Sequence, residues 1–417
     1  MSVKENYYML DPLDIMSNLD DVVPYFQAIF SADDHAVIGY EVFGRISMHG
    51  EVKSLGSFFQ DKNVPEEYHI EVDHLIINKA IQKLLMDSCK DVKLFINQSA
   101  SLLLKDQGVQ LLNLLLKYEK AGFQLSRLVI EINMPPAEDD LDLLQHLIQY
   151  YKTYGIQIAL SQIGHSSLNL DRFSLLSPSI LKVDLKMMRN SYDIQTHQDF
   201  LHSISIFARK MGTTLLYENV EASFQLQYAW RNGGRYYQGY YLHKPESTLI
   251  ERFYGKEQLH GKFQQFIRYE KRKLEAIHQL TNELQEKVNQ FNLKNKLPED
   301  RELIDQWLLH LAVPLTPYSF RMYLCDENGY QQSSNVTKDD NTWKIHEKYY
   351  LKNWSWRPYF LENVMKMRTV KKGMLTDIYS DIETQETIRT FSFPINNVVF
   401  LYVDISYSYL YENNDLL

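Results

Sequence analysis

Six acidic and amide residues each follow a short apolar segment of the chain, at the point where that segment ends. They are Glu41, Asn97, Glu131, Asp184, Glu218 and Gln238. Carboxylates exchange protons and hold cations, and amides orient neighbouring polar groups. One carboxylate after a strand means little, but six such groups after successive strands predict one polar cluster at the mouth of a barrel.

The apolar segments themselves predict eight strands: Phe26–Phe30, Ala36–Phe43, Val92–Asn97, Arg127–Ile132, Gly155–Leu160, Ile180–Asp184, Thr214–Tyr217 and Tyr236–Gln238. Only residues 31–35 separate the first two, which is too short for a crossover helix, so we expect an antiparallel hairpin there. Helical patterns lie between most of the later strands. The sequence therefore predicts an α/β fold, a (β/α)8 TIM-like barrel with an antiparallel first strand.

Composition narrows the class of protein. The chain has 417 residues, of which 45% are hydrophobic, and this is enough for two or three globular domains. A net charge of -9 argues against a nucleic-acid binder. Cys89 and Cys325 lie too far apart to suggest a disulfide framework or a zinc site. The chain lacks a signal-like start and a membrane-length apolar run, so we expect a cytoplasmic protein without a membrane span.

The organisation changes after the barrel. Apolar residues recur at helical spacing from Phe263 to Phe291, interrupted by Glu270 and Thr281. This helix either packs against its own domains or forms a dimer seam. Further strands are expected at Ser319–Cys325, Thr387–Phe393 and Val398–Asp404. We predict a barrel over residues 1–248, a linker helix over 249–297 and a smaller α+β domain over 298–417.

The ends of the predicted strands also lie within a series of short motifs. Gly39 to Arg45 reads GYEVFGR and resembles the Glu-Ala-Leu signature of EAL domains, which hydrolyse the bacterial messenger cyclic di-GMP. Further similar words follow in the same order: FINQS at 95–99, VIEI at 129–132, LKVD at 181–184, ENVE at 218–221 and QGYYL at 238–242. The resemblance covers the whole barrel. The layout with a C-terminal domain is most similar to YkuI-type EAL proteins.

The resemblance implies a two-metal phosphodiester chemistry and assigns roles to residues of this chain. Glu41, Asn97 and Glu131 would ligate a first ion, and Glu218 would serve a second. Lys182 would orient the attacking water or neutralise charge, and Arg45 would hold a phosphate. Gln238 would fix neighbouring groups, Gln27 would lie near the dinucleotide, and Asp184 would organise the site or brace a loop.

The sequence departs from the family at its metal-binding centre. Active members carry two adjacent aspartates where this chain has Ser161 and Gln162, so two anionic ligands are lost. The following loop, His165 to Leu168, lacks the usual Thr-Gly-Tyr, and Asn133-Met134 replaces the second glutamate of its strand word. One weak site for Mg²⁺, Ca²⁺ or Mn²⁺ remains.

These departures favour a catalytically degenerate receptor for cyclic di-GMP. Two alternatives stay open: a slow phosphodiesterase that uses one ion or substituted ligands, and a protein-interaction scaffold with a vestigial pocket. Homodimerisation is expected because EAL barrels commonly pair and the helical stripe offers a second surface.

The C-terminal domain resembles PAS-like Cache sensor modules. The likeness rests on the segment Trp354 to Phe360, read as a helix start, on Ser380-Asp381 and on the last strand. Arg357, together with Asp377 or Asp381, would recognise a small amphoteric ligand. The alternative is that the aromatic residues form a packed core and Arg357 a structural ion pair.

Overall fold

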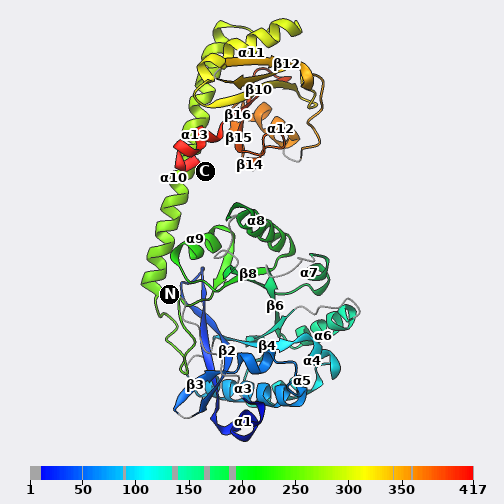
Figure 1. The fold of residues 1–417 in the computed structure, drawn as a ribbon, viewed down its shortest axis with the longest axis vertical. Helices are drawn as coiled ribbons and strands as arrows, with labels where there is room; N and C mark the ends of the chain where they lie inside the picture. The colour runs from blue at the N-terminus through cyan, green and yellow to red at the C-terminus, as the bar shows by residue number, and fades with distance from the viewer. Residues whose placement is uncertain are drawn as a thin grey trace. The chain divides into compact units, whose positions relative to one another are not determined.

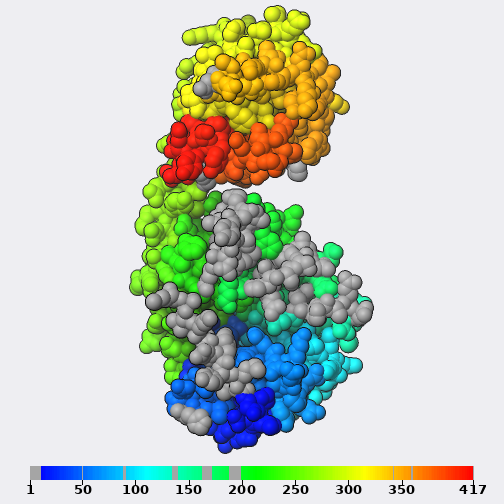
Figure 2. Space-filling view, viewed as in Figure 1, coloured from blue at the N-terminus to red at the C-terminus, as the bar shows by residue number. Residues whose placement is uncertain are grey.

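The computed structural model of the protein describes residues 11–48, 50–87, 91–133, 140–163, 170–186, 194–340, 342–357 and 360–416. The side chains of residues 162, 163, 170 and 194–198 lie outside this description. The chain divides into two compact units, Met1–Phe263 and Gln264–Leu417, and each is described by itself. Figure 1 shows the elements of both units, and Figure 2 shows their surface.

The first unit is a closed barrel. Its strands are β1 (Val22–Ser31), β2 (Val37–Met48), β4 (Lys93–Ser99), β5 (Leu128–Asn133), β6 (Gln157–Ile163), β7 (Ile180–Asp184), β8 (Thr214–Glu218) and β9 (Gly234–Tyr237). β1 runs antiparallel to both β2 and β9, whereas neighbouring strands from β2 and β4 through to β9 are parallel. This confirms the predicted barrel and its antiparallel first strand. The short β3 (Glu51–Ser54), which extends β2 as a hairpin, was not predicted.

Helices surround these strands (Figure 1). They are α1 (Pro12–Ser17), α2 (Gly56–Gln60), α3 (Glu66–Met86), α4 (Ala100–Lys105), α5 (Val109–Lys120), α6 (Leu141–Thr153), α7 (Leu170–Leu176), α8 (Ile194–Met211) and α9 (Ser223–Arg231). Their apolar faces cover the outside of the barrel: α5, for example, buries Leu111, Leu112 and Leu115.

The barrel interior explains how polar residues come together at its mouth. An apolar layer made of one residue from most strands fills the barrel: Ile29, Phe95, Val129, Ala159, Ile180, Leu216 and Tyr236. Side chains two positions apart on a strand point to the same side. The residues two positions further along therefore lie directly above this layer: Asn97, Glu131, Ser161, Lys182, Glu218 and Gln238. On antiparallel β1 the corresponding residue is Gln27, which lies opposite Glu41 in the register with β2.

The second unit is built on an antiparallel sheet. Its strands are β10 (Ser319–Asp326), β11 (Asn335–Asp339), β12 (Thr342–His346), β13 (Met374–Leu375), β14 (Tyr379–Ser380), β15 (Thr387–Pro394) and β16 (Val399–Ile405). They pair in the order β12-β11-β10-β16-β15-β13, and β14 also pairs with β15. One sheet face packs on α10 (Lys256–Lys294) and α11 (Arg301–Leu315), and the other packs on α12 (Phe360–Val370). A short α13 (Tyr407–Glu412) follows β16.

The long helix α10 carries the predicted apolar stripe, and most of that stripe packs within the chain. The Phe263 ring contacts the rings of His35 and Tyr237 in the first unit. Leu284 and Val288 are fully buried in the core of the second unit. The predicted boundaries at 248 and 297 stay a prediction. In the described part of the chain, the helices are all too short or too polar to cross a membrane.

Candidate functional site at the barrel mouth

A buried lysine lies at the centre of the polar cluster. The ammonium group of Lys182, on β7, is 2.8 Å from Glu41 Oε2, 2.5 Å from Glu131 Oε2 and 3.1 Å from Glu218 Oε2. The Lys182 side chain is completely buried, and the glutamates are largely buried. A charge removed from water needs a partner of opposite sign, so these four residues depend on one another.

The shared ammonium sets the charge states of the cluster. Burial disfavours the charged form of each group, and it raises the pKa of Glu131 to about 8, helped by the negative charge of Glu41. Burial also raises the pKa of Glu218. Burial opposes ionisation of Glu41 too, but the charge of Lys182 and the hydrogen bonds from Lys182, Asn97 and Gln238 lower its pKa overall. Despite burial, the three carboxylates hold the pKa of Lys182 well above its usual value, so it stays charged.

Amide side chains extend this cluster toward β1. Asn97 Nδ2 donates to Glu41 Oε1 at 2.8 Å, and Gln238 Nε2 donates to Glu41 Oε2 at 2.8 Å. Gln238 Nε2 also donates to Gln27 Oε1 at 3.0 Å, and Gln27 Nε2 donates to the His243 carbonyl at 3.0 Å. Gln238 Oε1 is buried and has no hydrogen-bond partner in the described part of the chain. An acceptor of this kind is suited to a ligand donor or a cation.

Asp184 links two loops beside the cluster around Lys182. Its Oδ1 accepts from the Lys186 backbone N–H at 2.7 Å and from Asn219 Nδ2 at 2.8 Å. Asn219 has a left-handed backbone, with a φ of 58°, which this residue type tolerates better than most. The loops after β7 and β8 are therefore tied to each other through Asp184.

The two positions at which active family members carry aspartates are occupied by the neutral residues Ser161 and Gln162. Ser161 is buried on β6, and its hydroxyl donates to Asn133 Oδ1 at 2.5 Å. Gln162 belongs to the same strand, but its side chain lies outside the described residues, as do Met134, His165 and residues 166–168. The Ser161–Asn133 pair supplies no negative charge to the mouth of the barrel.

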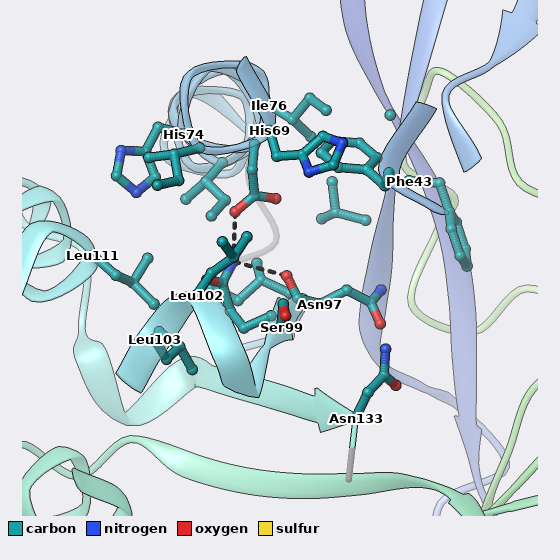
Figure 3. Close-up of a pocket in the computed structure, with 18 of the residues that line it drawn as sticks. Phe43, His69, His74, Ile76, Asn97, Ser99, Leu102, Leu103, Leu111 and Asn133 are labelled. Carbon is teal, nitrogen blue, oxygen red and sulfur yellow. Dashed lines mark hydrogen bonds between the residues drawn. The ribbon is translucent and has the colours of Figure 1, made fainter. Parts of the chain in front are cut away.

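A cavity of about 430 Å³ opens beside the cluster, between β2, β4 and the helices α3, α4 and α5. Figure 3 shows Asn97 and Asn133 on one side, His69 and His74 on α3, and apolar side chains such as Leu102 between them. Arg45 is part of the lining, and its Nη1 donates to Ser54 Oγ at 3.2 Å. The Arg45 guanidinium also lies 5.7 Å from the centre of the Tyr25 ring.

The sequence hypothesis missed Asp73, one of the acidic residues that line this cavity. Asp73 lies on α3 and accepts from Gln98 Nε2 at 2.5 Å. Burial raises its pKa to about 7. The available signal was an acidic residue directly after buried Val72 and three positions before buried Ile76, on a helix face that must pack on the barrel.

The donor set at the mouth has the right chemistry for a hard divalent cation. Glu41, Asn97 and Glu131 offer only carboxylate and amide oxygens, which Ca²⁺ and Mg²⁺ prefer. However, no group of three or more His, Cys, Asp or Glu side chains is arranged around a cation position in the described residues. Lys182 takes that place, so a bound ion would share the glutamates with the ammonium.

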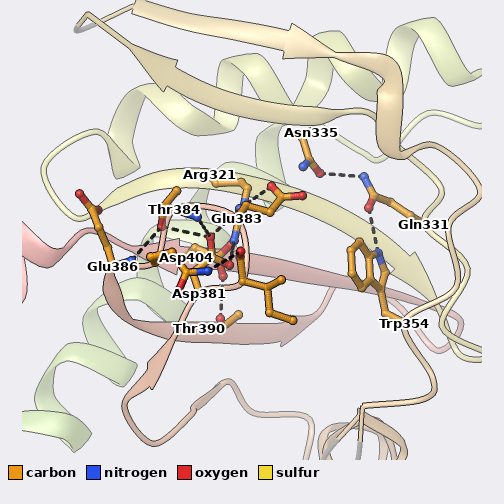
Figure 4. Close-up of polar contacts among 12 residues, drawn as sticks. Arg321, Gln331, Asn335, Trp354, Asp381, Glu383, Thr384, Glu386, Thr390 and Asp404 are labelled. Atoms are coloured by element: carbon orange, nitrogen blue, oxygen red, sulfur yellow. Dashed lines mark hydrogen bonds and ion pairs between the residues drawn. The ribbon is translucent and has the colours of Figure 1, made fainter. Parts of the chain in front are cut away.

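The second unit holds another buried charged group (Figure 4). Arg321 on β10 makes a bidentate ion pair with Asp381 and a 2.6 Å contact from Nε to Asp404 Oδ2. Glu383 completes the set at 3.1 Å. Asp381, one of the two aspartates expected to recognise a ligand together with Arg357, is therefore already engaged by Arg321. Arg357 instead lies 4.6 Å from the centre of the Trp354 ring, in the loop before α12, which begins at Phe360.

Comparisons with known proteins give matches along both parts of the chain. Residues 13–245 match the family model of the EAL domain, and residues 249–417 match the model of an EAL-domain associated signalling protein domain. The EAL-domain protein YkuI of Bacillus subtilis (strain 168) is 50% identical over 412 residues, which cover 98% of this chain and 100% of YkuI.

Solved structures of EAL-domain proteins are also similar to this chain. The crystal structure of B. subtilis YkuI in complex with cyclic di-GMP and calcium has a TM-score of 0.91, again at 50% identity over 98% of this chain and 100% of that chain. The FimX EAL domain from Pseudomonas aeruginosa shares the barrel fold, with a TM-score of 0.51, 24% identity and coverage of 58% of this chain and 100% of that chain. The chain belongs to the EAL-domain family.

Proposed function

We propose that the protein is a receptor for cyclic di-GMP that holds at most one divalent cation and does not hydrolyse its ligand. One observation carries this proposal: Lys182 is surrounded by three glutamates, and the adjacent Ser161–Asn133 pair is neutral. When ionised, the three glutamates and the ammonium leave two negative charges, which one divalent cation balances. Two divalent cations would leave an uncompensated positive charge at a site shielded from water.

Binding a cyclic dinucleotide needs less than cleaving it. Its phosphates need cationic donors, and Arg45 lines the cavity beside the cluster. A divalent cation held by Glu41, Asn97 and Glu131 would supply charge neutralisation for a phosphate. The 50% identical YkuI was crystallised with cyclic di-GMP and calcium, which supports the same ligand and the same class of ion for this chain.

The cavity fits a purine base of that ligand. Its walls include Phe43, Ile70 and Leu102, which provide apolar surface for the faces of the base. A guanine edge presents an N–H and an amino group as donors, and the Asp73 carboxylate accepts both in one plane. We therefore assign Asp73 to base recognition.

Calorimetry with cyclic di-GMP tests the receptor role. We expect micromolar or tighter binding in the presence of Ca²⁺ or Mg²⁺. Arg45→Ala should weaken binding by about tenfold to a hundredfold, because a charge-assisted contact to phosphate is lost. The control is Arg235→Ala, an exposed arginine at the other end of β9 from Gln238. No heat of binding at high ligand concentration would favour the scaffold hypothesis, and equal affinities of the two variants would remove Arg45 from the site.

Product analysis tests the loss of catalysis. The unchanged protein should release no linear dinucleotide above background with Mg²⁺ or Mn²⁺. The double variant Ser161→Asp, Gln162→Asp restores two anionic ligands and should gain measurable hydrolysis, while each single variant gains less because the ligands act together. Ser161→Asn, Gln162→Asn is the uncharged control. Robust turnover by the unchanged protein would contradict the receptor proposal and favour the phosphodiesterase alternative.

A further inference from the structure

Two histidines far apart in sequence contact each other at the end of the barrel opposite the carboxylate cluster. His35 lies in the turn between β1 and β2, and His260 lies in the first turns of α10. Their Nδ1 atoms are 3.3 Å apart, and their ring centres are 5.2 Å apart. His260 is exposed and His35 is half-buried, so both rings can be reached from solvent.

The surrounding structure holds His35 in place. Its backbone N–H donates to the Ser31 carbonyl at 3.1 Å, and the Ser31 N–H donates to the Ala36 carbonyl at 2.9 Å, which closes the turn. The His35 ring also packs on Phe263, with ring centres 5.1 Å apart. One imidazole of the pair is therefore positioned by its turn and by an aromatic neighbour before any ligand arrives.

The distance between the two nitrogens matches metal coordination. Two Zn–N bonds of about 2.0–2.1 Å at a tetrahedral angle place the nitrogen atoms about 3.3–3.4 Å apart. Imidazole nitrogen suits Zn²⁺, Ni²⁺ and Cu²⁺, whereas Mg²⁺ and Ca²⁺ favour oxygen ligands. The nearby charges are mixed. Asp34 precedes His35 in the turn and favours a cation, Asp33 is already paired with Arg235, and Lys256 on α10 opposes a cation.

We propose that His35 and His260 form a binding site for a zinc-class divalent ion, with water in the remaining coordination positions. The site is separate from the oxygen ligands at the barrel mouth and prefers a different class of metal. A bound ion joins the β1–β2 turn to the first turns of α10. The ion therefore stabilises the contact between the barrel and the helix that leads into the second unit.

Zinc titration of the full chain tests this site. The untagged protein is stripped with a chelator and titrated with Zn²⁺ against a competing dye, with millimolar Ca²⁺ present to occupy the oxygen ligands. We expect His35→Gln and His260→Gln each to bind zinc about tenfold more weakly or worse, because one of two protein ligands is lost. His278→Gln is the matched control, since His278 is exposed on the same helix.

Thermal unfolding gives an independent measurement on the same proteins. Zinc should raise the Tm of the unchanged protein and of His278→Gln, and should leave His35→Gln and His260→Gln unchanged. Equal Tm values without zinc would show that all the variants fold. Zinc affinity that is the same in the unchanged protein and in both pair variants would overturn the proposal, as would a zinc-induced Tm shift that persists in both.

Discussion

Lys182 compensates part of the negative charge at the barrel mouth without an added metal. Its ammonium contacts three glutamates at once, so these carboxylates lie together without the full repulsion of like charges. Removing the lysine would leave buried carboxylates unpaired, a change that typically costs about 3–5 kcal/mol. Its position therefore limits how tightly a cation can bind, because the ion must compete with a group that is covalently held in place.

We expect Asp73 to make the affinity for cyclic di-GMP depend on pH. Its pKa is raised from 3.8 to about 7, so a large fraction of this group is protonated near neutral pH in the free protein. Only an ionised carboxylate can accept two donors from a guanine edge, so we expect bound ligand to lower the pKa of Asp73 and binding near pH 7 to release protons. We expect affinity for cyclic di-GMP to fall as the pH is lowered from 8 to 6.

Calorimetry in buffers of different ionisation enthalpy measures this proton release. Asp73→Asn should bind more weakly at pH 8 and should lose most of the pH dependence, whereas Asp106→Asn, at another point of the cavity lining, should keep it. Affinity of the unchanged protein that stays constant from pH 6 to 8 would contradict the role assigned to Asp73.

At the scale of elements, the strands position most of the polar side chains at the barrel mouth. The period of two along each strand places Asn97, Glu131, Lys182 and Glu218 above the apolar layer, and the parallel register of β4 and β5 sets Asn97 opposite Glu131. The loop after β9 depends on one glycine: a Cβ on Gly239 would lie 2.1 Å from the Val220 carbonyl oxygen. This close approach lets the Val220 N–H donate to the Gln238 carbonyl at 3.0 Å, which fixes the residue that holds Glu41.

Local sequence patterns were sufficient to predict the barrel, because buried strands and amphipathic helices have clear hydrophobic periodicities. These patterns were insufficient to predict side-chain contacts that depend on how neighbouring strands are aligned. Lys182 was expected to orient a water or neutralise charge, but its three simultaneous partners follow from the register of several strands. Asp73 was missed because one acidic residue in a helix looks like any exposed position. Arg321 was missed because its partners Asp381 and Asp404 lie far away in the sequence.

For the whole molecule, the expected homodimer stays a prediction. The burial of several α10 residues limits the part of this helix that is available for a dimer interface. Phe263, Leu284 and Val288 are buried within the chain, whereas 56% of Leu274 is exposed midway along α10. Light scattering at micromolar concentration should give about twice 49.3 kDa. If α10 contributes, Leu274→Glu should shift the mass toward the monomer, and Leu293→Glu near the end of the helix should not. A mass of 49.3 kDa at all concentrations would exclude a stable dimer.

The way in which the barrel closes also determines when the site can form during synthesis. The partner of β1 on one side, β2, follows it directly in the chain, but its other edge pairs with β9, and the Gln27 side chain donates to a carbonyl 216 residues further along the chain. At about 5–20 residues per second, the ribosome needs roughly 10–40 s to pass from Glu41 to that residue. Throughout this interval the nascent chain carries an apolar strand with an unpaired edge, the kind of surface that chaperones recognise. We therefore expect the proposed ligand to stabilise only chains whose barrel has been translated almost to its end.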